Sequence, residues 1–370
     1  MEGKIEFISS LGKISFFLMV LFSIFLITVK TKRRLPNYLL ATMLLLVAFD
    51  LTGFFAWKWM SGSDVLVILK TASSLLQMPL FFLYLVSVCY ANFKLRPAHL
   101  LHGVVCLLFI FIFSLTNISE RSVFWFEITG ELQWAVYMLA CFRELFRYEK
   151  IHQENHSFPN SKAYKWLFQF AVISTIAHSL VTFRWLFSAF NWEIAVLNLN
   201  IGISISILLI TAWFVFKALH NPDLFTGVAT KLRPLKAKIK SGDALHQDDF
   251  NQKKKEKLLI YMEQEKPYLD YDLTLQKLAF QIDIIDKELS ILINHHIGQH
   301  FFDFVNEYRV NEAKRLLGNP DKKALTILEI LYQVGFNSKS SFYTAFKKIT
   351  GKTPVLYRKE RLQQESPTKK

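Results

Sequence analysis

The chain has 370 residues, of which 52 % are hydrophobic, 15 % aromatic and 20 % charged, and its net charge is +14. Soluble domains average about 25 % charged residues, so 35 phenylalanines and a mean hydropathy of +0.25 indicate contact with lipid. Scarce glycine and proline exclude collagen-like and linker-rich architectures. Cys89, Cys106 and Cys141 lie in apolar runs without metal-ligand or redox spacing, so we predict no metal site and no cofactor.

The two parts of the chain differ in composition. The first 216 residues are mostly apolar, whereas the last 154 are polar and carry 27 Lys and Arg against 19 Asp and Glu. A helix needs about 20 mainly apolar residues to cross a bilayer. Seven such stretches occur in the first part, at 8–29, 35–57, 66–91, 97–115, 124–145, 166–187 and 194–216. We therefore predict an all-α fold in which residues 1–216 form a seven-helix transmembrane bundle.

Lysine and arginine in the short loops predict the orientation, because cytoplasmic loops are enriched in them. With the N-terminus outside, the inner loops carry eleven of these residues and the outer side at most six. This orientation predicts a multi-pass membrane protein with everything from Lys217 onward in the cytoplasm. Residues 1–10 lack a basic region and no cleavage site follows the first span, so we expect an uncleaved anchor.

Ionisable residues inside membrane spans are costly and often functional. Asp50 and Glu131 lie inside the second and fifth predicted spans and are candidates for sensing a ligand or a proton. Arg143 and Arg184 lie near span ends, where long side chains reach the interface, and His178 can hydrogen-bond to a neighbouring helix.

A basic juxtamembrane linker is predicted at residues 217–257, with basic runs at 231–240 and 252–257. Such runs bind anionic lipid when they lie beside a membrane, and a solvated linker is the alternative. From residue 258 to 362 the chain is polar with helical periodicity, and residues 363–370 form a predicted disordered tail.

A duplicated helix-turn-helix pattern fills the polar part. The first unit has a helix with one apolar face, a tight turn after Asp283, and a second helix. The apolar positions of its first helix are Leu275, Leu278, Ala279 and Ile282. Leu278 and Ile282 recur 52 residues later as Ile330 and Val334. Leu289, Ile293 and Gly298 recur 53 residues later as Phe342, Phe346 and Gly351.

The second unit has its own local signals. Thr326 and Glu329 form a predicted capping box, and Gly335 in the turn can adopt a positive φ. Between the units, residues 301–317 have the apolar stripe of a helix about 25 Å long. The second helices of the two units could then enter successive major grooves, which lie about 34 Å apart.

Three segments carry a resemblance to a known family. GFNSKSSFYTAFKKITGKTPVLYRK at 335–359, LTILEILYQV before it and FFDFVNEYRVNEAKRLL upstream resemble the DNA-binding domain of AraC/XylS-type transcription regulators. The chain departs from the family at Leu331, where alanine is usual, and at 284–286, where a serine commonly precedes the second helix. The resemblance implies a bacterial regulator that binds double-stranded DNA, dimerises and recruits RNA polymerase.

The resemblance also implies that the second helix of each unit reads DNA. In the first reading helix, 286–296, the side chains expected to face DNA are Lys287, Ser290, Ile291 and Asn294. In the second, 338–349, they are Lys339, Ser340, Tyr343, Thr344 and Lys347, whereas Phe342, Phe346 and Ile349 should face the core. Lysine, asparagine, serine and threonine can bond to base edges. Lys348, Lys352 and Arg358 suit phosphate contacts, which set register.

The sequence as a whole predicts a membrane-anchored transcription regulator in which the membrane domain senses a signal and the double helix-turn-helix reads a promoter. It contains no phosphate-binding glycine loop and no catalytic triad spacing, so we predict no enzyme. One alternative is a membrane transport or lipid-handling protein with a DNA-binding reporter tail. Another is a passive membrane tether released by proteolysis within 224–257.

Overall fold

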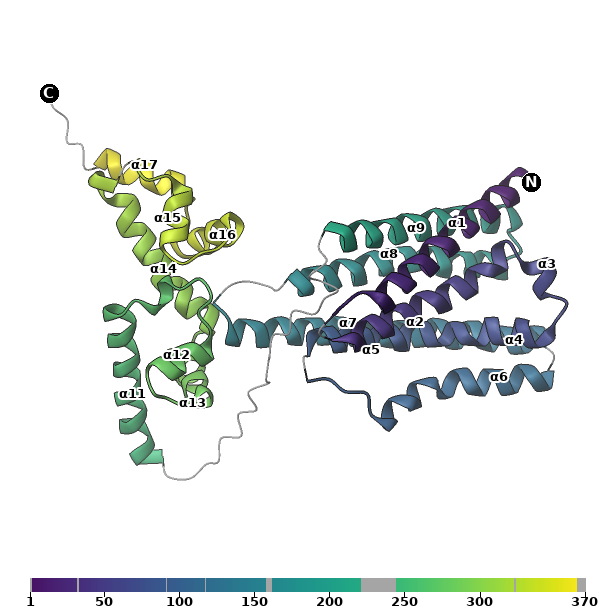
Figure 1. Cartoon of the computed structure of the whole chain (residues 1–370), viewed down its shortest axis with the longest axis horizontal. Coiled ribbons are helices and arrows are strands. Elements are labelled where there is room, and N and C mark those ends of the chain that lie inside the picture. Colours follow the sequence, from purple (N-terminus) through teal and green to yellow (C-terminus); the bar gives the residue numbers. More distant parts are fainter. Residues whose placement is uncertain are drawn as a thin grey trace. The chain divides into compact units, whose positions relative to one another are not determined.

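A computed structural model describes residues 2–31, 33–90, 92–116, 118–157, 162–220, 244–322 and 324–364 (Figure 1). Within these ranges the chain is helical and contains no strand. Residues 221–243 of the predicted linker and 365–370 of the predicted tail lie outside them. The chain separates into two compact units. The N-terminal unit comprises Met1–Tyr148 and Lys162–Lys231, and the C-terminal unit comprises Glu149–Ser161 and Leu232–Lys370.

Long apolar helices make up the N-terminal unit and lie side by side in Figure 1. Its α-helices are α1 (Glu2–Thr28), α2 (Arg34–Leu51), α3 (Trp57–Met60), α4 (Asp64–Ser73), α5 (Gln77–Cys89), α6 (Val104–Thr116), α7 (Glu120–Asn155), α8 (Lys162–Ala189) and α9 (Glu193–His220). The 3-10 turns are η1 (Thr52–Phe54), η2 (Ser74–Leu76) and η3 (Pro97–Gly103). The helix α1 packs against α2 and α9, and α8 packs against α9.

Six helical segments in the described residues are long and apolar enough to cross a membrane. They are Glu2–Thr28, Arg34–Phe54, Asp64–Cys89, Pro97–Thr116, Tyr164–Ala189 and Glu193–His220. The predicted fifth span, 124–145, lies in α7, which is not among the six. Glu127 and Glu131 lower the hydropathy of this part of α7. The number of seven spans therefore stays a prediction.

The two candidate sensing residues both have partners within the N-terminal unit. The carboxylate of Asp50 on α2 lies 3.0 Å from Lys70 Nζ on α4. Glu131 Oε2 on α7 lies 3.2 Å from His178 Nε2 and accepts a 2.9 Å hydrogen bond from the hydroxyl of Thr182, both on α8. These contacts hold pairs of helices together, which is a structural role. A sensing role for Asp50 and Glu131 stays a prediction.

Two hydrophobic cores, bridged by one helix, build the C-terminal unit. Its helices are α11 (Ala244–Gln264), α12 (Leu275–Gln281), α13 (Asp286–Ile291), α14 (Phe301–Gly318), α15 (Ile327–Gln333), α16 (Lys339–Thr350) and α17 (Pro354–Gln364), with the short helical turns η4 (Pro267–Leu269), η5 (Leu292–Ile297) and η6 (Pro320–Lys322). Leu278 and Leu289 lie in the first core, and Ile330 and Phe346 in the second. The apolar stripe of α14 contributes to both, with Phe304 in the first and Val310 in the second.

Several local predictions for this unit are confirmed. Thr326 and Glu329 form the capping box of α15, and Gly335 has φ = +88° in the turn before α16. The predicted first reading helix is less regular than expected, because α13 passes into the π-helical turn η5. The prediction that Ile349 faces the core is wrong, since this side chain is 40 % exposed. It lies in the last turn of α16, beyond the buried Phe342 and Phe346.

Replacing Gly335 by alanine should destabilise the C-terminal unit by about 2–4 kcal/mol, because a positive φ strains an L-residue and the new Cβ would clash. A Cβ there would lie 2.4 Å from the carbonyl oxygen of Tyr268 and 2.9 Å from that of Leu269. Gly298→Ala is the matched control, since φ is +79° there but no atom lies within 4 Å of the added Cβ. Urea-dependent proteolysis of the full-length protein measures both changes, and equal losses would contradict the role of the close contact.

Candidate nucleic-acid interface

The second reading helix, α16, has one buried and one exposed face. Ser338 caps its N-terminus by accepting a hydrogen bond from the amide N–H of Ser341. Phe342, Ala345 and Phe346 are buried in the second core. The residues predicted to face DNA are on the other side: Lys339, Ser340, Thr344 and Lys347 are exposed and Tyr343 is half-buried. Lys339 Nζ lies 5.5 Å from the centre of the Tyr343 ring.

This exposed face has the chemistry that base and phosphate contacts require. The exposed Ser340 and Thr344 present hydroxyl groups, and the exposed Lys339 and Lys347 present ammonium groups. Packing of the buried phenylalanines fixes the position of this helix on the domain. Ammonium groups donate to guanine O6 and N7, and hydroxyls bond to several base edges. The ring of the half-buried Tyr343 lies beneath the ammonium group of Lys339. Attraction between the two favours this conformation of the lysine.

The three predicted phosphate-binding residues have protein partners in this structure. Lys348 Nζ lies 2.7 Å from Asp303 Oδ1, and Lys352 pairs with Glu360. Arg358 is half-buried and donates a 2.7 Å hydrogen bond to the carbonyl oxygen of Leu325, and burial lowers the pKa of its guanidinium. A phosphate contact by either lysine would replace a surface ion pair, which contributes little to stability.

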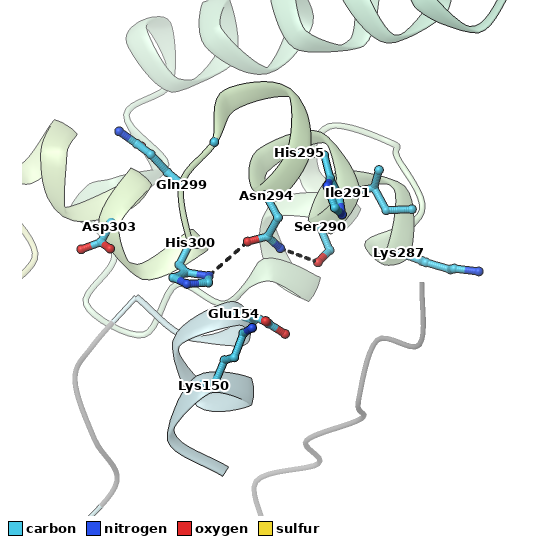
Figure 2. A pocket seen from close by; sticks show the side chains of 11 residues that line it. Lys150, Glu154, Lys287, Ser290, Ile291, Asn294, His295, Gln299, His300 and Asp303 are labelled. Carbon is cyan, nitrogen blue, oxygen red and sulfur yellow. Dashed lines mark hydrogen bonds between the residues drawn. The ribbon is translucent and has the colours of Figure 1, made fainter. Parts of the chain in front are cut away.

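The first reading helix presents its predicted contact residues differently. Lys287 is exposed and Ile291 half-buried, but Ser290 is only 4 % exposed. Asn294 Nδ2 donates a 3.2 Å hydrogen bond to Ser290 Oγ, and Asn294 Oδ1 lies 3.3 Å from His300 Nδ1 (Figure 2). These side-chain polar groups are therefore engaged within the protein. The assignment of all predicted contact residues to DNA stays a prediction.

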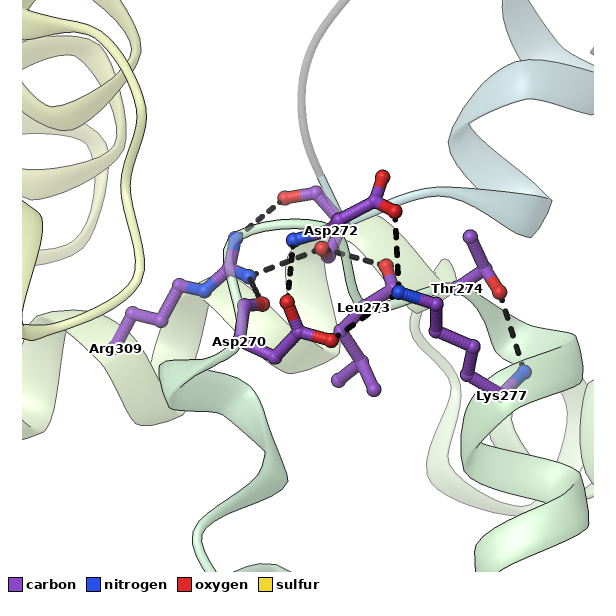
Figure 3. Close-up of polar contacts among 7 residues, drawn as sticks. Asp270, Asp272, Leu273, Thr274, Lys277 and Arg309 are labelled. Atoms are coloured by element: carbon purple, nitrogen blue, oxygen red, sulfur yellow. Dashed lines mark hydrogen bonds and ion pairs between the residues drawn. The ribbon is translucent and has the colours of Figure 1, made fainter.

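One buried arginine, which the sequence analysis did not single out, organises the C-terminal unit. Arg309 on α14 is 1 % exposed. Its guanidinium donates to the carbonyl oxygen of Asp270 (2.7 Å; Figure 3). It also donates to the carbonyl oxygens of Tyr268 (2.7 Å) and Ser157 (2.8 Å) and to Ser157 Oγ (3.0 Å). Burial lowers the pKa of Arg309 to about 10. The available signal was an arginine within the apolar stripe of residues 301–317.

Comparisons with known proteins agree with this reading of the C-terminal unit. Residues 278–360 match a family model described as a helix-turn-helix domain. The chain is 32 % identical over 97 residues to the HTH-type transcriptional regulator GlxA of Rhizobium meliloti, covering 26 % of this chain and 29 % of that protein. It is 36 % identical over 90 residues to an uncharacterised HTH-type transcriptional regulator of Staphylococcus aureus, covering 24 % of this chain and 12 % of that protein.

Among solved structures, the C-terminal domain of AraT, a response regulator from Geobacillus stearothermophilus, is 28 % identical with a TM-score of 0.27, covering 32 % of this chain and 92 % of that one. The chain spans less than a third of the length of the two curated relatives. Together, the duplicated helix-turn-helix units, their core residues and the family match show that the C-terminal region carries a helix-turn-helix domain of the AraC type, the class found in DNA-binding transcription regulators.

Proposed function

We propose that the protein is a membrane-anchored transcription regulator of the inner (cell) membrane, whose C-terminal unit binds double-stranded DNA in the cytoplasm. The observation that carries the proposal is the exposed polar face of α16 opposite its buried phenylalanines. No catalytic role is part of this proposal. Dimerisation and recruitment of RNA polymerase are further parts of it that rest on the family resemblance.

Membrane anchoring is supported by the N-terminal unit. Its helices expose large apolar side chains, among them Phe17 (63 %), Leu107 (65 %) and Leu139 (71 %). Exposed apolar area of this kind is unfavourable in water and favourable in lipid. We include α7 as the fifth of seven spans, because Glu131 has hydrogen-bond partners on α8 and pairing reduces the cost of a carboxyl group in a bilayer.

The segments that pack together in the C-terminal unit support the proposed orientation of the protein in the membrane. His156 and Ser157, at the end of the segment Glu149–Ser157, contact residues 273, 274 and 309, which follow α9 in the chain. The segment and these residues must therefore lie on the same side of the membrane, as they do when α8 and α9 form two spans. A unit that binds DNA must face the cytoplasm, and the basic residues Arg143 and Arg147 before this segment and Lys150 within it agree with that side.

Sensing by the membrane domain is the finer part of the proposal. The ion pair Asp50–Lys70 joins α2 to α4, and the contact Glu131–His178 joins α7 to α8. A ligand that binds one arrangement of these helices more tightly than another would shift the protein toward that arrangement. Asp50→Asn and Glu131→Gln should then alter the response to the signal while leaving DNA binding by the C-terminal unit intact.

Changes in the exposed face of α16 test the DNA-binding role. Lys339→Ala with Tyr343→Ala should weaken specific binding by about 1–3 kcal/mol for each lost base contact, whereas Lys348→Ala should mainly reduce the salt dependence. Crosslinking and genome-wide recovery of DNA with the tagged full-length protein measures the first effect. Lys314→Ala is the matched control, because it removes the same charge from α14 rather than from a reading helix. Unchanged recovery with the double variant would contradict the proposal.

A further inference from the structure

The end of α7 packs with the DNA-binding unit although it lies more than a hundred residues away in the sequence. Ser157 is completely buried. Its backbone N–H and its hydroxyl both donate to the carbonyl oxygen of Leu273, at 3.3 and 2.8 Å, and Arg309 donates to its carbonyl and hydroxyl oxygens. His156 forms an antiparallel bridge with Thr274, whose side chain caps α12. The segment Glu149–Ser157, named the docked segment below, is thus attached beside the first helix-turn-helix.

This attachment places the docked segment against the first reading helix. A cleft of about 380 Å³ is lined by Lys150 and Glu154 of the docked segment and by all four residues predicted to face DNA (Figure 2). These four are Lys287, Ser290, Ile291 and Asn294. Figure 2 shows the end of α7 next to Ser290 and Asn294. Ser290, at this cleft, has a low exposed fraction, in agreement with a neighbouring segment on this side.

We propose that the docked segment is an autoinhibitory element, which competes with DNA for the first reading helix. This inference rests on the proposed function. The major groove is about 12 Å wide and an α-helix with its side chains about 10–12 Å across, so the groove admits one helix. The end of α7 lines the cleft opposite the DNA-facing side of the first reading helix, so a duplex and the docked segment would compete for the same space. Binding through both units requires that the docked segment leaves.

The position of the docked segment in the chain makes it a route for regulation. It is continuous with the earlier part of α7, which belongs to the N-terminal unit. A change in the membrane helices that favours release of the segment favours DNA binding, and DNA binding favours release by the same factor. The apparent affinity for DNA equals the affinity of the released form multiplied by the fraction of molecules in which the segment is released.

Ser157→Pro tests this competition, because it removes both the backbone N–H and the hydroxyl that hold the segment. Ser157→Thr is the matched control, since it keeps both groups. Each is made in the full-length protein, held in bilayer discs, with and without Ser290→Cys. The first readout is the rate at which a maleimide labels Cys at this position; the three native cysteines are buried. The second is affinity for a duplex of about 40 base pairs selected from a random pool with the Ser157→Pro protein.

We expect Ser157→Pro to raise the labelling rate and to tighten DNA binding, each by about tenfold if the segment is released about a tenth of the time in the wild type. Ser157→Thr should behave like the wild type. Equal labelling and equal affinity in the wild type and Ser157→Pro would overturn the autoinhibitory contact. Faster labelling without DNA binding by any variant would keep the docked segment but overturn the proposed DNA-binding function, so the two failures are distinguishable.

Discussion

Replacing Arg309 by methionine is expected to destabilise the C-terminal unit by about 3–5 kcal/mol, the range seen when one partner of a buried charged network is removed. The cause is the number of acceptors that would lose their donor. The carbonyl oxygens of Tyr268, Asp270 and Ser157 all accept from this guanidinium. A buried acceptor without a partner costs about 1–3 kcal/mol. Methionine fills much of the volume of the arginine side chain but donates no hydrogen bond to these three acceptors.

The same substitution should affect three separate parts of the C-terminal unit at once. The guanidinium joins α14 to η4 and to the docked segment, and it lies 5.6 Å from the ring centre of Phe336 in the second helix-turn-helix. The guanidinium is also close to the turn before α16, because a Cβ added at Gly335 would lie 3.0 Å from Arg309 Nε. We therefore expect loss of protection in both helix-turn-helix units, measured by hydrogen exchange on the full-length protein.

Arg309→Lys separates charge from geometry. Lysine keeps the positive charge but has a single donor atom, whereas the bonds of Arg309 spread over three nitrogen atoms. We expect this variant to lose most of the stability that methionine loses. Stability equal to that of the wild type would show that the charge alone matters. Lys314→Met is the control for a half-buried cation of α14 that lies outside this network.

The features of this fold that follow from local rules were predictable from the sequence. Apolar residues at helical spacing predicted the buried faces of α12 and α15, and the capping box and Gly335 turn were confirmed. Ile349 shows the limit of such rules, because spacing places it on the face of Phe342 but the core does not extend to the last turn of α16.

Contacts between distant segments were not predictable in this way. Nothing in the polar sequence from Glu149 to Ser157 indicates that it packs beside Leu273, Thr274 and Arg309, since these partners follow it by more than a hundred residues. Likewise, the position of Arg309 in an apolar stripe marks it as unusual, but its acceptors are backbone carbonyls, which every residue carries. In the proposed autoinhibited state, the same contacts decide whether the first reading helix is accessible. The sequence therefore predicted the reading residues but not the docked segment beside them.

Acidification should release the docked segment, through two histidines on it. His152 is 1 % exposed, and its ring stacks on that of His156 with centroids 4.3 Å apart. Burial, together with the neighbouring His156, lowers the pKa of His152 to about 3. Burial also lowers the pKa of His156, although its backbone contact to His152 and the Asp272 carboxylate oppose this. Lys277, 3.1 Å from Asp272, weakens the influence of that carboxylate.

The direction of the effect follows from proton uptake. A released histidine has a pKa of about 6.5, so below that pH the released segment binds protons that the docked segment does not. Docking is therefore strongest above about pH 6.5 and weakens as the pH falls toward the lowered pKa of the docked state, by up to about 1.4 kcal/mol per unit for each histidine. From about pH 7.5 to about pH 5.5, one such histidine changes the docking equilibrium about tenfold.

We expect labelling of Ser290→Cys, normalised to that of free cysteine at each pH, to rise about fivefold over this range if one histidine titrates, and toward the limit of about tenfold if both do, for a segment that is released about a tenth of the time at pH 7.5. His152→Phe keeps an aromatic ring against His156 but cannot take up the proton, so only the weaker dependence from His156 should remain. A flat wild-type profile, or an unchanged slope in His152→Phe, would show that these histidines do not control the docked segment. If the profile holds, the contact that covers the first reading helix is released by protons as well as by movement of the membrane helices, because both act on the docked segment.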